Sequence, residues 1–283
     1  MMVKRWIRVA ALSALAGLIG CAPYGWPRSG EKIIRNVVFS QPNNHPLRMD
    51  LYVPKTATPA PVVVWIFGGS WKFGSKAYHV NLRDLTRSGI AVAAIEYRLS
   101  GTAIYPAQLQ DCEAAVEWLR AHGAEVGIDP KRIGVSGESS GGHLAALLGT
   151  VEGKAKIRAV CALYPPTDLI TLGAKYENPK QLSNIDRLLG GRVSRKISLA
   201  KEASPLEHVS NDSPPFLLIH GANDTLVPLD QSQQFDEKLK RVGVESRLSV
   251  VPEKGHWFLL NPAQLSEVAQ FFCRHFGMAP TGS

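Results

Sequence analysis

A serine stands at the centre of a glycine-rich stretch that joins two different patterns. Residues 132–150, "RIGVSGESSGGHLAALLGT", pass from strand-like apolar residues into the small residues of a helix. Inside them, Gly-Glu-Ser-Ser-Gly fits the G-x-S-x-G pattern of a nucleophile elbow. Gly137 and Gly141 would leave room for a sharp turn that strains the backbone of Ser139. We therefore predict Ser139 as a nucleophile, with the Ser140 amide at the helix start facing an oxyanion.

A lone pattern of this kind is also explained by a glycine-rich turn with a serine cap, so the chemistry needs partners. A nucleophilic serine requires a base and a carboxylate that orients the base. Asp224 follows the predicted strand 214–221, and His256 follows the predicted strand 246–252. The chain order Ser, Asp, His is the order that accompanies this elbow. The predicted catalytic residues are therefore Ser139, Asp224 and His256.

Other histidines and aspartates fit structural roles better. His143 lies inside the helix one turn after Ser139, where we expect packing, and His220 precedes the acid loop, which it would buttress. We expect four rival aspartates to be solvated acids or helix caps, with Asp230 at a helix N-cap. These are Asp168, Asp212, Asp230 and Asp236.

A second glycine-rich segment, "WIFGGSWKFGSK" at residues 65–76, follows a buried strand and is expected to form the oxyanion loop. Gly68 and Gly69 would offer backbone N–H groups there, together with the Ser140 amide. The side chains expected to line a substrate pocket are Ser70, Trp71, Glu138 and Trp257.

Strands alternate with helices along the rest of the chain. Residues 33–40 and 46–54 predict an antiparallel pair, and the run "APVVVWIFGG" predicts a strand buried on both faces. A helical segment is expected near 77–88. The alternation predicts an α/β fold with a mostly parallel, doubly wound sheet of about eight strands. Residues 167–213 lack a clear period and suit a small cap.

The motif set resembles a known family of enzymes. "FGGSWKFGSK", "EYRLS", "HGANDTLVP" and "KGHWF", with the serine motif, are similar to α/β-hydrolase esterases related to hormone-sensitive lipase, closest to the BD-FAE type of feruloyl and acetyl-xylan esterases. The resemblance covers residues 45–276. It implies the α/β-hydrolase fold, the roles given above and no cofactor or metal. Such relatives carry His-Gly-Gly-Gly-Trp in the oxyanion loop, where this chain has Phe67 and Ser70.

The first twenty residues have the pattern of an export signal. Three basic residues precede an apolar run too short to span a membrane. "LIGC" at residues 18–21 resembles the lipobox of bacterial lipoproteins, which implies cleavage before Cys21 and lipidation of that cysteine. We therefore expect a signal peptide at 1–20, a tether at 21–30 and a catalytic domain at 31–277. The implied location is the bacterial cell envelope, on the periplasmic side of the outer membrane.

Composition sets further bounds on 283 residues that are 45% hydrophobic and 20% charged, values typical of one globular domain. The net charge of +8 falls to +5 without the signal, because three of the 32 basic residues and none of the 24 acidic ones lie in it. No basic block interleaved with aromatic residues indicates nucleic-acid binding. Cys112, Cys161 and Cys273 lack metal-ligand spacing and are expected as buried free thiols.

We expect a lipid-anchored serine esterase that cleaves short-acyl esters, with acetyl or feruloyl esters of polysaccharide fragments as the class the resemblance implies. A serine amidase or peptidase of the same fold is the alternative within enzymes. A non-catalytic binding protein on a hydrolase fold is the alternative outside them, but such a protein typically loses the serine or the histidine.

Overall fold

The computed structural model describes residues 30–77, 81–152 and 156–278. The expected signal peptide, Cys21 and all but the last residue of the tether lie outside these ranges. Within the described ranges, no helix combines the length and the apolar character that crossing a bilayer requires.

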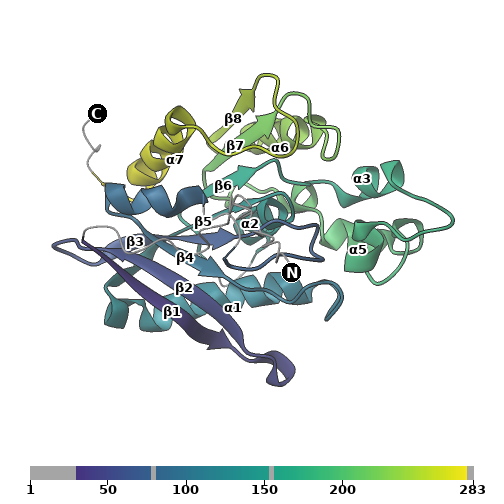
Figure 1. Cartoon of the computed structure of the whole chain (residues 1–283). Coiled ribbons are helices and arrows are strands. Elements are labelled where there is room, and N and C mark those ends of the chain that lie inside the picture. The colour runs from purple at the N-terminus through teal and green to yellow at the C-terminus, as the bar shows by residue number, and fades with distance from the viewer. Residues whose placement is uncertain (1–29, 78–80, 153–155, 279–283) are drawn as a thin grey trace, which may run out of the picture.

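A twisted sheet of eight strands forms the centre of the molecule, in the order β1-β2-β4-β3-β5-β6-β7-β8 (Figure 1). Strand β2 pairs antiparallel with β1 and with β4, and all other neighbours are parallel. This confirms the mostly parallel sheet that the sequence predicts. The strands are β1 (Glu31–Ser40), β2 (Leu47–Pro54), β3 (Ala60–Ile66), β4 (Ala91–Ile95), β5 (Ile128–Glu138), β6 (Val160–Leu163), β7 (Phe216–Gly221) and β8 (Ser246–Val251).

Helices cover both faces of the sheet, because its central strands are apolar on both sides. In β3, Val62 and Val64 pack into the core that α1, α2 and α6 cover, whereas Val63 and Trp65 pack into the core under η2 and α7. The fold is therefore doubly wound, as the sequence predicts. These elements are α1 (Ala107–His122), α2 (Ser140–Thr150), α6 (Asp230–Arg241), α7 (Pro262–His275) and the 3-10 helices η1 (Pro42–Asn44), η2 (Asn81–Ser88) and η3 (Gly123–Val126).

Five short helices lie between β6 and β7, in the segment without a clear sequence period. Figure 1 shows α3 and α5 of this segment together beyond the edge of the sheet. We call residues 167–213 the cap. Its helices are α3 (Leu169–Lys175), α4 (Asn184–Leu188), η4 (Val193–Arg195), α5 (Ile197–Glu202) and η5 (Pro205–His208).

The segment expected to be helical near 77–88 is helical, since its described part, Asn81–Ser88, is a 3-10 helix. The expectation for Asp230 needs correction. Asp230 is the first residue of α6 and does not cap it. Asp168 caps α3, one of the two roles expected for it, with its carboxylate accepting from the amides of Ile170 and Thr171, because it has the extended backbone that an N-cap requires.

A buried ion pair ties the end of the oxyanion loop to the first two strands. Lys76 Nζ lies 2.9 Å from Asp50 Oδ1 and 2.9 Å from Asn36 Oδ1, and the Asn36 amide donates to the same Asp50 oxygen. Both charged residues are buried. Because a buried charge that loses its partner is costly, this contact should matter far more than a surface pair.

We expect Lys76→Met to lower the free energy of unfolding by about 3 kcal/mol, since it removes the nearer and more buried of the two cations at Asp50 and leaves Arg35 at 3.9 Å. Urea denaturation measures this change. Arg87→Ala, which breaks the exposed pair of Arg87 with Asp84, is the control and should cost about 0–1 kcal/mol. Equal effects of the two substitutions would contradict this reading of the Lys76–Asp50 pair.

Candidate active site

Ser139 sits in a strained turn between β5 and α2. Its backbone has φ 52° and ψ −120°, in a region that residues with a side chain rarely adopt. The turn is tight enough that a Cβ added to Gly141 would lie 2.1 Å from the Ile66 carbonyl oxygen, and one added to Gly137 would lie 2.4 Å from the Gly141 carbonyl oxygen. Only glycine fits at either position. The predicted elbow is therefore present.

The structure brings the other two predicted catalytic residues to Ser139. His256 Nε2 lies 2.9 Å from Ser139 Oγ, and His256 Nδ1 lies 2.7 Å from Asp224 Oδ2. A carboxylate can only accept, so Nδ1 carries the imidazole proton and Nε2 is free to accept the serine proton. The three side chains come from the ends of β5, β7 and β8, which meet at one edge of the sheet because the strands are parallel.

The Asp224 carboxylate is surrounded by donors. Its Oδ1 accepts from the amides of Leu226 and Val227, and its Oδ2 lies 3.3 Å from His220 Nε2 as well as 2.7 Å from His256. Burial alone would raise the pKa of Asp224, but the hydrogen bonds from His220 and His256 outweigh it and hold this pKa well below its ordinary value. Asp224 is therefore ionised, and His220 supports it as expected.

The oxyanion loop lies directly against the elbow, but the amide of its first glycine, Gly68, already makes a hydrogen bond within the protein. A Cβ added to Gly68 would lie 3.3 Å from the Ser139 Cβ. The Gly68 amide donates to the Glu138 carboxylate, which corrects the expectation that Gly68 faces an oxyanion. The Gly69 and Ser140 amides remain the expected donors, and the next amide of the loop, that of Ser70, is a further candidate.

Glu138 also differs from its prediction as a pocket residue. It is buried beneath the oxyanion loop, because the residue before the elbow serine still belongs to β5. Tyr164 donates its hydroxyl to Glu138 Oε2 over 3.1 Å. Desolvation raises the pKa of Glu138 to about 7 against these two hydrogen bonds. Glu138 thus holds the loop from below.

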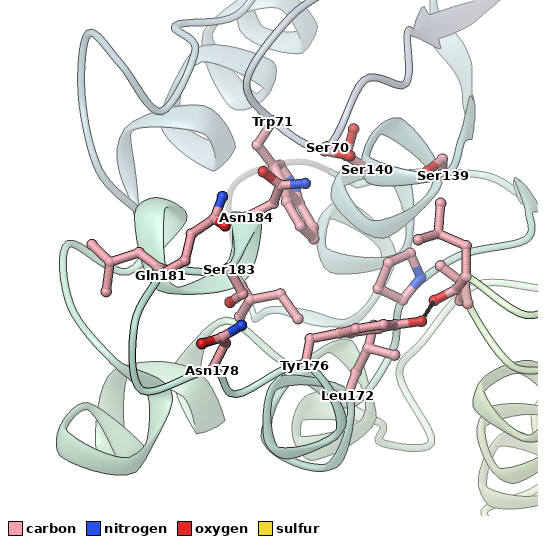
Figure 2. A pocket seen from close by; sticks show the side chains of 15 residues that line it. Ser70, Trp71, Ser139, Ser140, Leu172, Tyr176, Asn178, Gln181, Ser183 and Asn184 are labelled. Carbon is pink, nitrogen blue, oxygen red and sulfur yellow. Dashed lines mark hydrogen bonds between the residues drawn. The ribbon is translucent and has the colours of Figure 1, made fainter.

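A cavity of about 310 Å³ opens beside Ser139, between the oxyanion loop and the cap. Figure 2 shows Ser70, Trp71, Ser139 and Ser140 on one side, facing Leu172, Tyr176 and Asn178 of the cap. Ser70 and Trp71 therefore line the pocket, as predicted. The other lining residues are Pro166, Gln181, Leu182, Ser183, Asn184, Ile185, Leu226 and Val227.

Trp257 does not line this cavity. Its side chain is 61% exposed and packs edge-on against His256, with ring centroids 4.8 Å apart. Tyr164 packs edge-on against the same imidazole from the buried side, at the same centroid distance. The sequence analysis missed Tyr164, whose one signal was its place at the end of β6. It also missed the cap side chains, since their segment has no period.

Cysteines and metal-binding groups complete the inventory of reactive side chains. Cys112, Cys161 and Cys273 are free and buried, as expected. Within the described ranges, no three His, Cys, Asp or Glu side chains are grouped to hold a metal ion.

An eight-stranded, mostly parallel sheet with a Ser-His-Asp relay at its strand ends defines the α/β-hydrolase class. The chain belongs to the BD-FAE family, whose model matches residues 49–239. It is 32% identical over 230 residues to the esterase LipC of Mycobacterium tuberculosis, a match that covers 75% of this chain and 56% of that protein. The chain thus spans a little over half the length of this relative and of the esterase-like LipM of the same organism.

Two solved structures share the fold over nearly their whole length. A truncated carbohydrate esterase from gut microbiota has a TM-score of 0.78 and 27% identity, covering 89% of this chain and 99% of that one. The propionate-bound esterase Est2 of Thermogutta terrifontis has a TM-score of 0.73 and 26% identity, covering 89% of this chain and 97% of that one.

The raised pKa of Glu138 predicts a pH effect on stability. The folded state keeps a proton on Glu138 that the unfolded state releases near pH 4.5, so this group lowers stability as pH rises from there to about 7. Glu138→Gln stays neutral throughout. We expect its stability relative to the wild type to increase by about 3 kcal/mol between pH 4.5 and pH 8. Chemical denaturation at the two pH values measures this, and an unchanged difference would show that Glu138 ionises normally.

Proposed function

We propose that this protein is a serine esterase that hydrolyses carboxylic esters of short acyl groups. The observation that carries the proposal is the relay of Ser139, His256 and Asp224, with hydrogen bonds of 2.9 and 2.7 Å, beside a cavity that Ser139 itself lines. The esterase relatives and structural neighbours support the same reaction class.

The geometry assigns each residue a step in the reaction. Ser139 Oγ attacks the ester carbonyl carbon while His256 Nε2 takes its proton, and the carbonyl oxygen becomes an oxyanion against the free amides. Each strong amide donor contributes about 3 kcal/mol to that step. The intermediate then expels the alcohol, which takes the proton from His256. Water, activated by the same imidazole, hydrolyses the acyl-enzyme. Asp224 keeps its charge and holds the imidazole in the productive tautomer throughout.

The cavity supports a preference for short acyl groups. Its apolar walls come from Leu172 and Ile185 of the cap and from Leu226 and Val227 of the acid loop. At about 310 Å³ it is at the small end of the usual range for ligand pockets. The Est2 neighbour is a propionate-bound esterase.

The polar side chains of the cap suit an ester whose alcohol part carries further hydroxyl groups, as in acetyl or feruloyl esters of polysaccharide fragments. Asn178, Gln181 and Asn184 bring three carboxamides to the pocket, and a carboxamide both donates to and accepts from a hydroxyl. One structural neighbour is a carbohydrate esterase.

We expect p-nitrophenyl acetate and butyrate to be turned over faster than the decanoate, because the cavity is short. Ser139→Ala should lower kcat by at least ~10⁴-fold, and Asp224→Asn by about 10⁴-fold, since the asparagine favours the wrong imidazole tautomer. The rate of p-nitrophenolate release, followed by absorbance across the chain-length series, measures both effects. Fastest turnover of long acyl chains would contradict the size argument. Hydrolysis of anilides but not esters would favour the amidase alternative.

We also propose that the chain is exported and held at the envelope membrane by lipid on Cys21, on the strength of its basic, apolar and lipobox-like N-terminus. Expression in a bacterium fed an alkyne fatty acid should label the wild type and place it in the membrane fraction. Cys21→Ser should lose the label and the membrane association together. A labelled Cys21→Ser protein would place the lipid elsewhere.

A further inference from the structure

The oxyanion loop contains two consecutive residues in a left-handed conformation. Ser70 has φ 55° and Trp71 has φ 57°, although neither is glycine. Such a residue costs about 1–3 kcal/mol and persists only where its surroundings fix it. The Ser70 amide, a candidate oxyanion donor, lies in this strained pair. Some contact must therefore hold the turn in place.

The side chain of Trp71 supplies that contact. Its indole is buried, and Nε1–H donates to Nδ1 of His143 over 3.1 Å, with the two rings edge to face. The Trp71 carbonyl also accepts from the Ser100 amide over 2.7 Å. At the other end of the loop, the ring of Phe67 stacks on that of Tyr97 and offers no polar side-chain anchor.

His143 is fully engaged and electrically neutral. It lies on α2 one turn after Ser139, is completely buried, and its Nε2 lies 2.7 Å from the Ala203 carbonyl oxygen. An indole can only donate and a carbonyl can only accept, so Nδ1 is bare and Nε2 carries the proton. Burial lowers the pKa of His143 to about 4, which preserves this neutral form. Both nitrogens are occupied, so His143 does not act as a base for Ser139.

We propose that His143 is a positioning residue that sets the oxyanion hole through its hydrogen bond with Trp71. Helix α2 carries both the Ser140 amide at its first residue and His143 one turn later. The bond to Trp71 therefore fixes the Gly69 and Ser70 amides in the same frame as the helix amide. The imidazole also binds the carbonyl of Ala203, the residue that follows α5 in the cap, so the cap is connected to the same arrangement. The inference rests on the proposed esterase function.

Two substitutions at His143 separate its two hydrogen bonds. In His143→Asn the side-chain oxygen occupies the place of Nδ1 and still accepts from Trp71, while the donor to Ala203 is lost. In His143→Gln the side-chain nitrogen reaches the place of Nε2 and still donates to Ala203, while the acceptor for Trp71 is lost. Trp71→Phe removes the same bond from the other side. Thr150→Val, which deletes a buried hydrogen bond to Ala146 at the far end of α2, is the matched control.

The rate at which an activated p-nitrophenyl phosphonate ester modifies Ser139 is the first readout. Ser139 Oγ bonds to phosphorus, p-nitrophenolate leaves, and the serine proton passes to His256, so the oxyanion hole is tested without any assumption about the natural ester. We expect about 10- to 100-fold slower modification in His143→Gln and Trp71→Phe, because small misplacement of a catalytic group has effects of this size. His143→Asn should stay within about 5-fold of the wild type, and Thr150→Val should match it.

Ester kinetics and an indole signal complete the test. In His143→Gln, kcat should fall with KM nearly unchanged, since His143 does not line the pocket. The Trp71 indole N–H resonance should lie downfield in the wild type and in His143→Asn, and move upfield in His143→Gln. Equal losses in His143→Asn and His143→Gln, or an unchanged rate in Trp71→Phe, would overturn the inference. Normal phosphonylation without ester turnover would instead reject the proposed function alone.

Discussion

The contact between Gly141 and the end of β3 is the constraint on which the site depends. An added Cβ at Gly141 would lie 2.1 Å from the Ile66 carbonyl oxygen and 2.5 Å from that of Phe67. This approach presses the start of α2 against the strand that leads into the oxyanion loop. The turn that exposes Ser139 and the loop that faces it are thus two sides of one contact, and neither can shift without the other.

Burial acts in opposite directions on the two carboxyl groups of the site. Asp224 accepts from two backbone amides and from His256, and His220 Nε2 lies 3.3 Å from the same carboxylate, so Asp224 stays charged and can support an imidazolium. Glu138 has Tyr164 and the Gly68 amide as polar neighbours, and desolvation keeps a proton on it up to about pH 7. One carboxyl therefore serves the reaction by its charge, and the other serves the loop by its shape.

Local sequence patterns predict much of the fold and the three catalytic residues. The remaining features depend on side-chain directions that these patterns do not determine. Strand and helix order, the elbow at Ser139 and the strand-end positions of Asp224 and His256 follow from apolar periods and chain order. The direction of the Glu138 side chain depends on the pleat of β5, and that of Trp257 depends on the path of the loop after β8. Sequence alone therefore misassigned both. The cap was recognised as a segment only, because helices this short depend on tertiary packing and leave no period.

Two neighbouring residues of the cap, Lys175 and Tyr176, bind the cap to the acid loop. Tyr176, which follows α3, donates its hydroxyl to the Leu226 carbonyl over 2.6 Å, and the neighbouring Lys175 reaches the Thr225 carbonyl. Leu226 is also one of the residues whose amide holds Asp224. The cap and the loop that holds Asp224 therefore form one structural unit. Anyone grafting a relative's cap onto this scaffold to change its selectivity would need to transplant the 224–227 turn with it.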